Sequence, residues 1–96
     1  MNPEDLIKVK RDDILEIASR HGAKNIRVFG SVARGEATES SDIDFLVDFE
    51  EVRSLFDIAA LEVDLEELLG RKIDIVTEKG LYWLLKRRIL KEACPL

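Results

Sequence analysis

Apolar residues follow two different spacings along the chain, and each spacing predicts a type of element. Recurrence every three to four positions is typical of helices, and it runs through three segments: 3–20, 55–70 and 81–93. Short runs rich in β-branched residues, or alternating with polar ones, are typical of strands, and they occupy three further segments: 25–29, 41–49 and 71–77. Between the first two strands, residues 31–35 predict a turn that opens a short helical segment.

The segment 41–49 has the clearest strand pattern, because polar and apolar side chains alternate along it. Side chains of a strand point alternately to its two faces. One face would carry four apolar residues: Ile43, Phe45, Val47 and Phe49. The other would carry three aspartates and a leucine: Asp42, Asp44, Leu46 and Asp48. The first face is predicted to enter the core and the second to stay open.

The predicted order is helix, strand, strand, helix, strand, helix. This order is typical of an α+β fold in which a small mixed β-sheet has helices packed on one face. The opposite face, with its carboxylates, would then offer room for a substrate. A Ser54–Asp57 capping box is expected to begin the second long helix, and Tyr82 and Trp83 are expected to enter the core at the start of the last one.

Composition supports one compact domain over residues 1–96, since the chain has 46% apolar and 36% charged residues. The net charge of -5 disfavours direct binding to nucleic acid or to an anionic membrane, and it suits a basic protein partner. The single cysteine, Cys94, is expected to act as a small hydrophobe. Without a signal peptide or a membrane-spanning run, we expect a cytoplasmic protein.

The aspartates of the open face are the first candidates for chemistry. Asp42 and Asp44 would project from one face about 6–7 Å apart. If the segment 71–77 pairs beside this strand, Asp74 projects from the same face, and three carboxylates converge. Hard oxygen ligands of this kind suit Mg²⁺. Two such ions would stabilise the attacking and leaving oxygens of an in-line nucleotidyl displacement.

The preceding motif, GSVARG, has the residues that a triphosphate requires. Gly30 allows close approach of the backbone, and Ser31 offers a hydroxyl and an N–H beside the start of a helical turn. Arg34 has two open interpretations: it contacts a phosphate or the acidic cluster, or it holds a backbone carbonyl in the turn or is simply solvated. The motif therefore predicts a phosphate site next to the metal site.

Together these motifs resemble the minimal nucleotidyltransferases of the DNA polymerase beta-like superfamily. The family pattern is Gly-Ser-x-Ala-Arg-Gly, a short loop, Ser-Asp-Ile-Asp, and a later strand with a third acidic residue. The matching residues of this chain are Gly30, Ser31, Ala33, Arg34, Gly35, Ser41, Asp42, Ile43, Asp44 and Asp74. The resemblance spans most of the chain and implies the nucleotidyltransferase fold.

The resemblance also implies an enzyme that transfers AMP from ATP to an acceptor hydroxyl with two Mg²⁺ ions. Asp42 and Asp44, together with Asp74, would be catalytic and hold the metal, and Asp74 would help to activate the acceptor. Gly30, Ser31 and Arg34 would bind the nucleotide phosphates. Small stand-alone members look like antitoxins that add AMP to a tyrosine of a HEPN-domain RNase toxin, which implies such a protein partner.

Two alternatives remain open at this stage. The chain would neutralise its toxin by binding alone, without catalysis, or it would transfer AMP to a small molecule such as an aminoglycoside. The resemblance disfavours the second alternative, because aminoglycoside nucleotidyltransferases carry an additional drug-binding domain for which this chain is expected to have no room.

Overall fold

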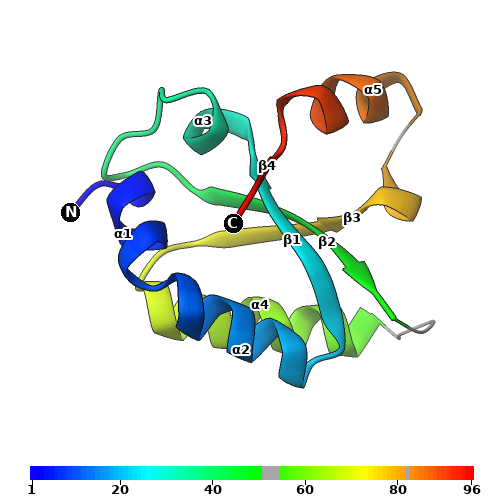
Figure 1. Cartoon of the computed structure of the whole chain (residues 1–96), viewed down its shortest axis with the longest axis horizontal. Coiled ribbons are helices and arrows are strands. Elements are labelled where there is room, and N and C mark those ends of the chain that lie inside the picture. The colour runs from blue at the N-terminus through cyan, green and yellow to red at the C-terminus, as the bar shows by residue number, and fades with distance from the viewer. Residues whose placement is uncertain (51–54, 82) are drawn as a thin grey trace.

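A computed structural model describes residues 1–50, 55–81 and 83–96. Its strands form one four-stranded sheet in the order β3-β2-β1-β4 (Figure 1). The strands are β1 (Ala23–Phe29), β2 (Ile43–Phe49), β3 (Ile73–Thr77) and β4 (Cys94–Pro95). The helices are α1 (Pro3–Val9), α2 (Arg11–Arg20), α3 (Gly30–Ala33), α4 (Leu55–Leu69) and α5 (Trp83–Glu92), with a 3-10 turn η1 (Glu78–Gly80) after β3.

The sheet is mixed, as predicted. β1 pairs antiparallel with β2 on one side and with β4 on the other, whereas β2 and β3 are parallel. A parallel pair needs a crossover connection, and α4 provides it. The antiparallel register shifts near Asn25, which has a positive φ of 51°. The α+β fold class is thus confirmed.

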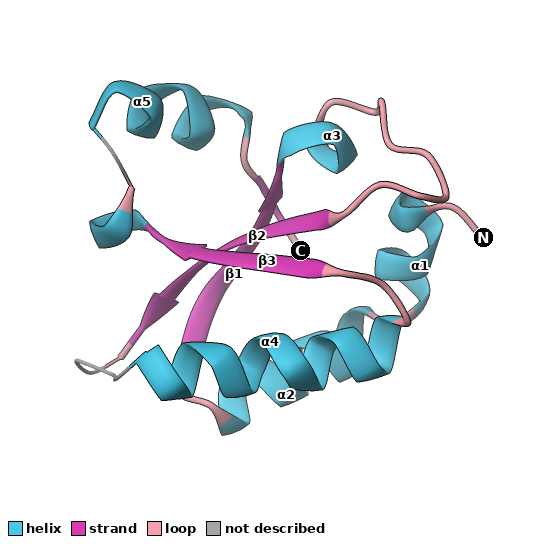
Figure 2. Cartoon of the chain, turned by 180° about the vertical axis from the view of Figure 1, so that it is seen from behind, coloured by secondary structure: helices cyan, strands magenta, loops and turns pink. Residues whose placement is uncertain are grey.

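Helices lie on both sides of the sheet. α2 and α4 cover one face, while α3 and α5 lie on the opposite side (Figures 1 and 2). The expectation that the helices pack on one face therefore holds for α2 and α4 but not for α5. The spacing of apolar residues identifies a helix but carries no information about which side of the sheet the helix will reach.

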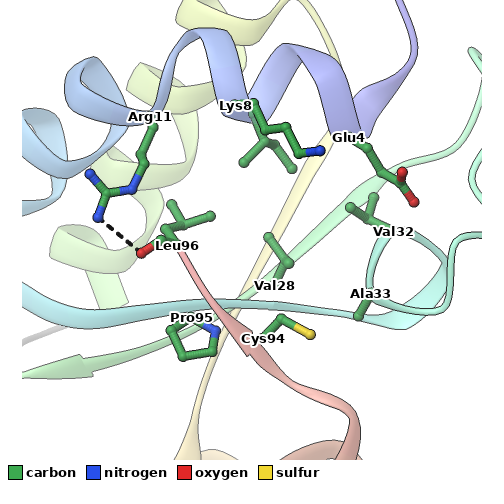
Figure 3. Close-up of a pocket in the computed structure, with 10 residues that line it drawn as sticks. Glu4, Lys8, Arg11, Val28, Val32, Ala33, Cys94, Pro95 and Leu96 are labelled. Carbon is green, nitrogen blue, oxygen red and sulfur yellow. Dashed lines mark hydrogen bonds between the residues drawn. The ribbon is translucent and has the colours of Figure 1, made fainter.

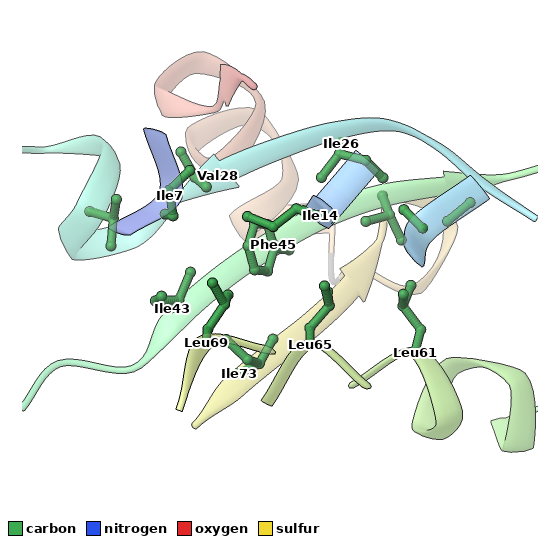
Figure 4. Close-up of a cluster of buried hydrophobic side chains, with 14 residues drawn as sticks. Ile7, Ile14, Ile26, Val28, Ile43, Phe45, Leu61, Leu65, Leu69 and Ile73 are labelled. Carbon is green, nitrogen blue, oxygen red and sulfur yellow. The ribbon is translucent and has the colours of Figure 1, made fainter. Parts of the chain in front are cut away.

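The core fills the layer between the sheet and α2 and α4. Ile43, Phe45 and Val47 project from β2 into this layer and are almost fully buried. They meet side chains of both covering helices: Ile14 and Ala18 of α2, and Leu61, Leu65 and Leu69 of α4 (Figure 4). The alternation predicted for the segment 41–49 is confirmed on this face. Leu46 projects to the other side and is also fully buried, so that face is partly covered as well.

The N-terminal segment differs from the single helix expected over 3–20. It forms α1 and α2, which meet at Lys10, whose φ of -98° and ψ of 9° depart from helical values. Asn2 caps α1 by accepting a hydrogen bond from the Asp5 N–H at 2.9 Å. The break leaves a basic residue at the end of one helix and acidic residues at the start of the next, where each interacts favourably with the helix dipole.

The C-terminal end contains an element that the sequence pattern did not predict. After α5 ends, the two-residue strand β4 pairs with β1, and the Leu96 N–H donates to the carbonyl of Ile26 at 3.1 Å. The predictions for Ser54, for Tyr82 and for burial of the Trp83 side chain lie outside what the structure describes. Among the helices that the structure describes, none is long and apolar enough to cross a membrane.

Candidate active site

An acidic pair lies on the sheet face opposite the core. Asp44 of β2 and Asp74 of β3 are direct partners in the parallel register. Paired residues of neighbouring strands leave the sheet on the same side, and the two carboxyl groups lie close enough for Asp74 to raise the pKa of Asp44. The structure therefore places Asp74 beside Asp44, on the face where the alternation predicted it. The part that each plays in catalysis stays a prediction.

The environment of Asp44 disfavours its charge. Its pKa is raised from 3.8 to about 6, first by burial and then by the charge of Asp74 and the hydrogen bond with it. The charge of Asp42 raises the pKa further, and Arg34 lowers it. A cation bound between these carboxylates would favour their ionised forms, so the electrostatics suit a divalent ion.

Asp42 is less firmly placed than the pair. It lies in the loop before β2 and is exposed. Within 1–50, 55–81 and 83–96, no three acidic, histidine or cysteine side chains surround one point closely enough to hold a metal ion. The expected convergence of three carboxylates is thus corrected to a close pair with a third charge nearby, because Asp42 precedes the strand and no ladder partner fixes it.

The donor chemistry nevertheless fits Mg²⁺. All three side chains offer only carboxylate oxygens, which are the hard ligands that this ion prefers. Mg²⁺ in nucleotide sites commonly takes one or two protein carboxylates and completes its shell with phosphate oxygens and water. Asp44 and Asp74 supply that number, with Asp42 within electrostatic reach. Metal binding by these residues stays a prediction.

Gly30 joins β1 to α3 where the backbone passes directly against Asp44. Its φ is +71°, a backbone conformation that residues with a Cβ rarely adopt. A Cβ at this position would also collide with Asp44 Oδ2. Glycine is therefore required here for two physical reasons, backbone geometry and close approach, and the close approach is to a carboxylate of the protein.

Ser31 follows Gly30 in α3 and is half-buried. Its carbonyl accepts a hydrogen bond from the Glu36 N–H at 2.9 Å, which closes the turn. Its hydroxyl makes no hydrogen bond to any residue that the structure describes. That hydroxyl is available for a ligand, which agrees with the phosphate-binding role that the motif predicts. The role itself stays a prediction.

Arg34 is engaged by two carboxylates of the protein. Its Nη1 donates to Glu92 Oε1 at 3.0 Å, and its Nε lies 3.3 Å from Glu36 Oε1. Glu92 was not identified as a site residue in the sequence analysis, because it lies at the end of α5, 58 positions along the chain from Arg34. In the described part of the chain the Arg34 guanidinium contacts these two carboxylates and not a backbone carbonyl, which neither interpretation foresaw. Contact with a phosphate stays a prediction.

Other charged residues have structural partners. Asp48 lies two positions beyond Leu46 on the acidic face, but it accepts a hydrogen bond from Asn25 Nδ2 at 2.9 Å and pairs with Arg27 at 3.3 Å. His21 ends α2 and its Nε2 lies 2.6 Å from Asp64 Oδ2 of α4. Neither residue belongs to the acidic pair.

An apolar pocket of about 230 Å³ lies elsewhere, between α1, α3 and the β4 edge (Figure 3). Cys94 and Pro95 form one wall and Ile7 and Val28 contribute to another. Cys94 is exposed rather than buried among hydrophobic residues. Since none of the three candidate aspartates lines this pocket, the candidate active site is the acidic face and not the pocket.

The fold and the acidic face together define a nucleotidyltransferase. The model of the nucleotidyltransferase domain family matches residues 11–96, and the chain belongs to that family. The resemblance inferred from the Gly30 and Asp42 motifs is confirmed, and so is the predicted class of enzyme.

Curated relatives cover most of the chain. A Methanocaldococcus jannaschii protein with the provisional name protein adenylyltransferase MJ0435 is 48% identical over 86 residues, which are 90% of this chain and 91% of that protein. Protein adenylyltransferase MntA of Thermococcus cleftensis is 47% identical over 77 residues, covering 80% of this chain and 78% of that protein.

Solved structures share the fold. One, provisionally described as a minimal nucleotidyltransferase, superposes with a TM-score of 0.86 at 52% identity and covers 97% of this chain and 95% of that one. A toxin-antitoxin complex with AMP-PNP gives a TM-score of 0.77 at 20% identity over 88% of this chain and 69% of that chain. The MntA-HepT toxin-antitoxin structure gives 0.71 at 17% identity over 92% and 69%. At such identities the last two show a common fold.

Proposed function

We propose that this chain transfers AMP from ATP to a hydroxyl group of a partner protein in a Mg²⁺-dependent reaction. The observation that carries the proposal is the in-register pairing of Asp44 with Asp74, directly against Gly30. The name of the relative at 48% identity, a protein adenylyltransferase, supports the choice of acceptor and of transferred group. AMP-PNP in a complex of the same fold supports ATP as the donor.

The reaction forms a bond between the acceptor oxygen and the α-phosphorus of ATP. It breaks the bond from that phosphorus to the oxygen that bridges to the β-phosphate. AMP stays on the acceptor, and pyrophosphate leaves with the electron pair of the broken bond. In this proposal Asp74 receives the proton of the acceptor hydroxyl, because it is the exposed member of the pair.

Asp44 and Asp74 would hold the metal, with Asp42 as the third, nearby carboxylate of the site. When bound, Mg²⁺ would neutralise phosphate charge and stabilise the attacking and leaving oxygens of the displacement. The free hydroxyl of Ser31 would orient the phosphates beside the pair. Arg34 would stand next to the turn as a supporting cation, since two carboxylates already occupy its guanidinium.

The partner that we propose is a toxin of the HEPN class, modified on a tyrosine. The support is the MntA name of one relative and the toxin-antitoxin complexes among the proteins that share the fold. Under this proposal the chain acts as an antitoxin, and modification of the toxin blocks its RNase activity.

Labelled ATP tests the proposal. The chain is incubated with Mg²⁺, ATP labelled at the α-phosphate and the HEPN protein encoded next to its gene, and label on the partner is measured. We expect transfer by the wild type and none by the Asp42→Asn, Asp44→Asn double variant. Asp48→Asn is the matched control, because Asp48 lies on the same strand but pairs with Arg27. Equal labelling by the double variant would refute the assigned roles.

The same variants separate catalysis from occlusion. If neutralisation needs chemistry, the double variant still binds the toxin but no longer suppresses it in cells. If suppression persists in full, the chain acts by covering the toxin, and the enzymatic account of neutralisation is wrong. An assay with aminoglycosides in place of the partner protein identifies transfer to a small molecule.

A further inference from the structure

Glu92 makes a contact that neither the motif nor the proposed reaction explains. Its Oε1 accepts a hydrogen bond from the Gly30 N–H at 2.7 Å and another from Arg34 Nη1 at 3.0 Å. One carboxylate oxygen thus binds both ends of the short turn that contains Ser31. The contact joins the last residue of α5 to the first residue of α3, which lie side by side in Figure 1.

The surroundings of Glu92 give this contact more strength than a surface ion pair. The Glu92 side chain is only 19% exposed, whereas Glu36, the other carboxylate on Arg34, is 64% exposed. Hydrogen bonds to a charged acceptor are stronger than neutral ones, and partial burial reduces screening by water. The chain leaving Glu92 is also held, because β4 pairs with β1 immediately afterwards. Glu92 is therefore a fixed anchor for the turn.

Gly30 transmits this anchoring to the acidic pair. Its N–H is bound by Glu92, while its Cα lies so close to Asp44 that a Cβ would strike Oδ2. The backbone at Gly30 thus sterically limits where the Asp44 carboxylate can lie. If Gly30 moves away, Asp44 gains freedom, and Ser31 moves with it because the two residues are adjacent.

The contact also changes the assignment of the phosphate-binding groups. A backbone N–H donates one hydrogen bond at a time with good geometry. Because the Gly30 N–H already donates to Glu92, it is not available to a phosphate while that bond lasts. Phosphate recognition by the motif then falls to Ser31, and Gly30 contributes shape instead.

We infer that Glu92 is a positioning residue, which holds the Gly30–Arg34 turn so that Asp44 and Ser31 keep the geometry that nucleotidyl transfer needs. The catalytic part of this inference rests on the proposed function, but the hydrogen bond itself does not. Groups that orient the direct ligands of a metal or substrate typically contribute about 10- to 100-fold in affinity or activity.

Two variants distinguish the hydrogen bond from mere bulk. Glu92→Gln keeps an oxygen that accepts from the Gly30 N–H, and Glu92→Ala removes it. Amide hydrogen exchange at Gly30 reads the bond directly, without any activity assay. We expect exchange at Gly30 to be about 10-fold faster or more in Glu92→Ala and to stay within about threefold of wild type in Glu92→Gln. Equal protection in both variants would overturn the anchoring role.

Steady-state transfer to the HEPN partner reads the consequence for catalysis. We expect kcat of Glu92→Ala to fall about 10- to 100-fold, with most activity restored in Glu92→Gln, and KM for ATP to change less than kcat. Glu36→Ala is the matched control, because it removes the exposed carboxylate on Arg34 and leaves Gly30 bound. Its kcat should stay within about twofold of wild type.

The outcomes separate this inference from the proposed function. A lower KM for ATP with unchanged kcat in Glu92→Ala would show that Glu92 competes with phosphate, and the positioning role would be wrong. Equal loss in Glu92→Ala and Glu36→Ala would assign the effect to Arg34 alone and overturn the role of Gly30. If the wild type transfers no label, the proposed function is wrong. The exchange experiment would still test whether Glu92 holds the Gly30 N–H.

Discussion

The two faces of β2 are built from alternate residues of the same strand, yet they are held in opposite ways. Ile43, Phe45 and Val47 are buried against α2 and α4, where packing stabilises the fold. On the other face, Asp44 lies beside Asp74, and its pKa is raised first by burial and then by the charge of Asp74. The comparison shows that the apolar face of β2 stabilises the fold. This stabilisation offsets the unfavourable proximity of Asp44 and Asp74 on the other face.

The largest effect is expected on the acidic face. Asp44→Asn should lower the rate of AMP transfer by about 10³-fold or more, because a metal ligand contributes several kcal/mol of transition-state stabilisation. The variant should stay folded, since the core face is untouched. Transfer of α-labelled phosphate, together with circular dichroism, measures both quantities. Full activity in this variant would contradict the proposal that the acidic face carries out AMP transfer.

A substitution on the core face should mainly lower the stability of the fold. Phe45→Ala is expected to lower the free energy of unfolding by about 3–5 kcal/mol, because it removes a fully buried aromatic side chain and leaves a cavity. Urea denaturation measures this loss. Phe45→Leu should lose much less, because it refills most of the volume. A loss below about 1 kcal/mol for Phe45→Ala would contradict the central place of this side chain.

Gly30 lies where the acidic face meets the turn, and its replacement should affect both activity and stability. Gly30→Ala is expected to cost about 1–2 kcal/mol for the positive φ and to reduce transfer further by displacing Asp44 Oδ2. Gly70→Ala is the control, since Gly70 has a similar φ of +64° but no atom within 4 Å of the added Cβ. The melting temperatures of Gly30→Ala and Gly70→Ala should be similar. The rate of AMP transfer should be lower in Gly30→Ala than in Gly70→Ala.

The smallest expected effect concerns pH in metal-free protein. Because the pKa of Asp44 rises from 3.8 to about 6 on folding, the folded state binds more protons between these values, and stability falls as pH rises from about 4 to 6. Asp44→Asn should reduce this decline and gain about 1 kcal/mol or less at pH 7, since the partly exposed group is screened by water. Melting curves in chelator from pH 3.5 to 7.5, with Asp12→Asn as an exposed control, measure the difference. A steeper decline in Asp44→Asn would contradict the origin given for the shift.

Much of the site could be predicted because it depends on short-range sequence pattern. Alternation alone assigned Phe45 to the core and Asp44 to the opposite face, since strand geometry leaves no other arrangement. The position of Asp74 beside Asp44 required one further assumption, that the third strand pairs with the second. The Gly30–Ser31 turn was predictable for the same reason, because glycine and serine favour it locally.

The remaining features depend on contacts between distant segments. No periodicity of residues 81–93 indicates that α5 lies opposite α2 and α4, or that Glu92 reaches Gly30. The break at Lys10 has no proline or glycine to announce it, and β4 is too short to show a pattern. Asp42 was expected to converge with the pair, but its place in a loop before β2 leaves its side chain without the restraint of a strand.

The parallel pairing of β2 with β3 has a consequence for synthesis on the ribosome. Asp42 and Asp44 emerge early, but Asp74 follows only after the whole of α4, and the two strands become neighbours only when that crossover has closed. A nascent chain, or a fragment cut within α4, would hold Asp42 and Asp44 without Asp74. If all three carboxylates serve the proposed transfer, we expect activity to begin only after translation has passed β3.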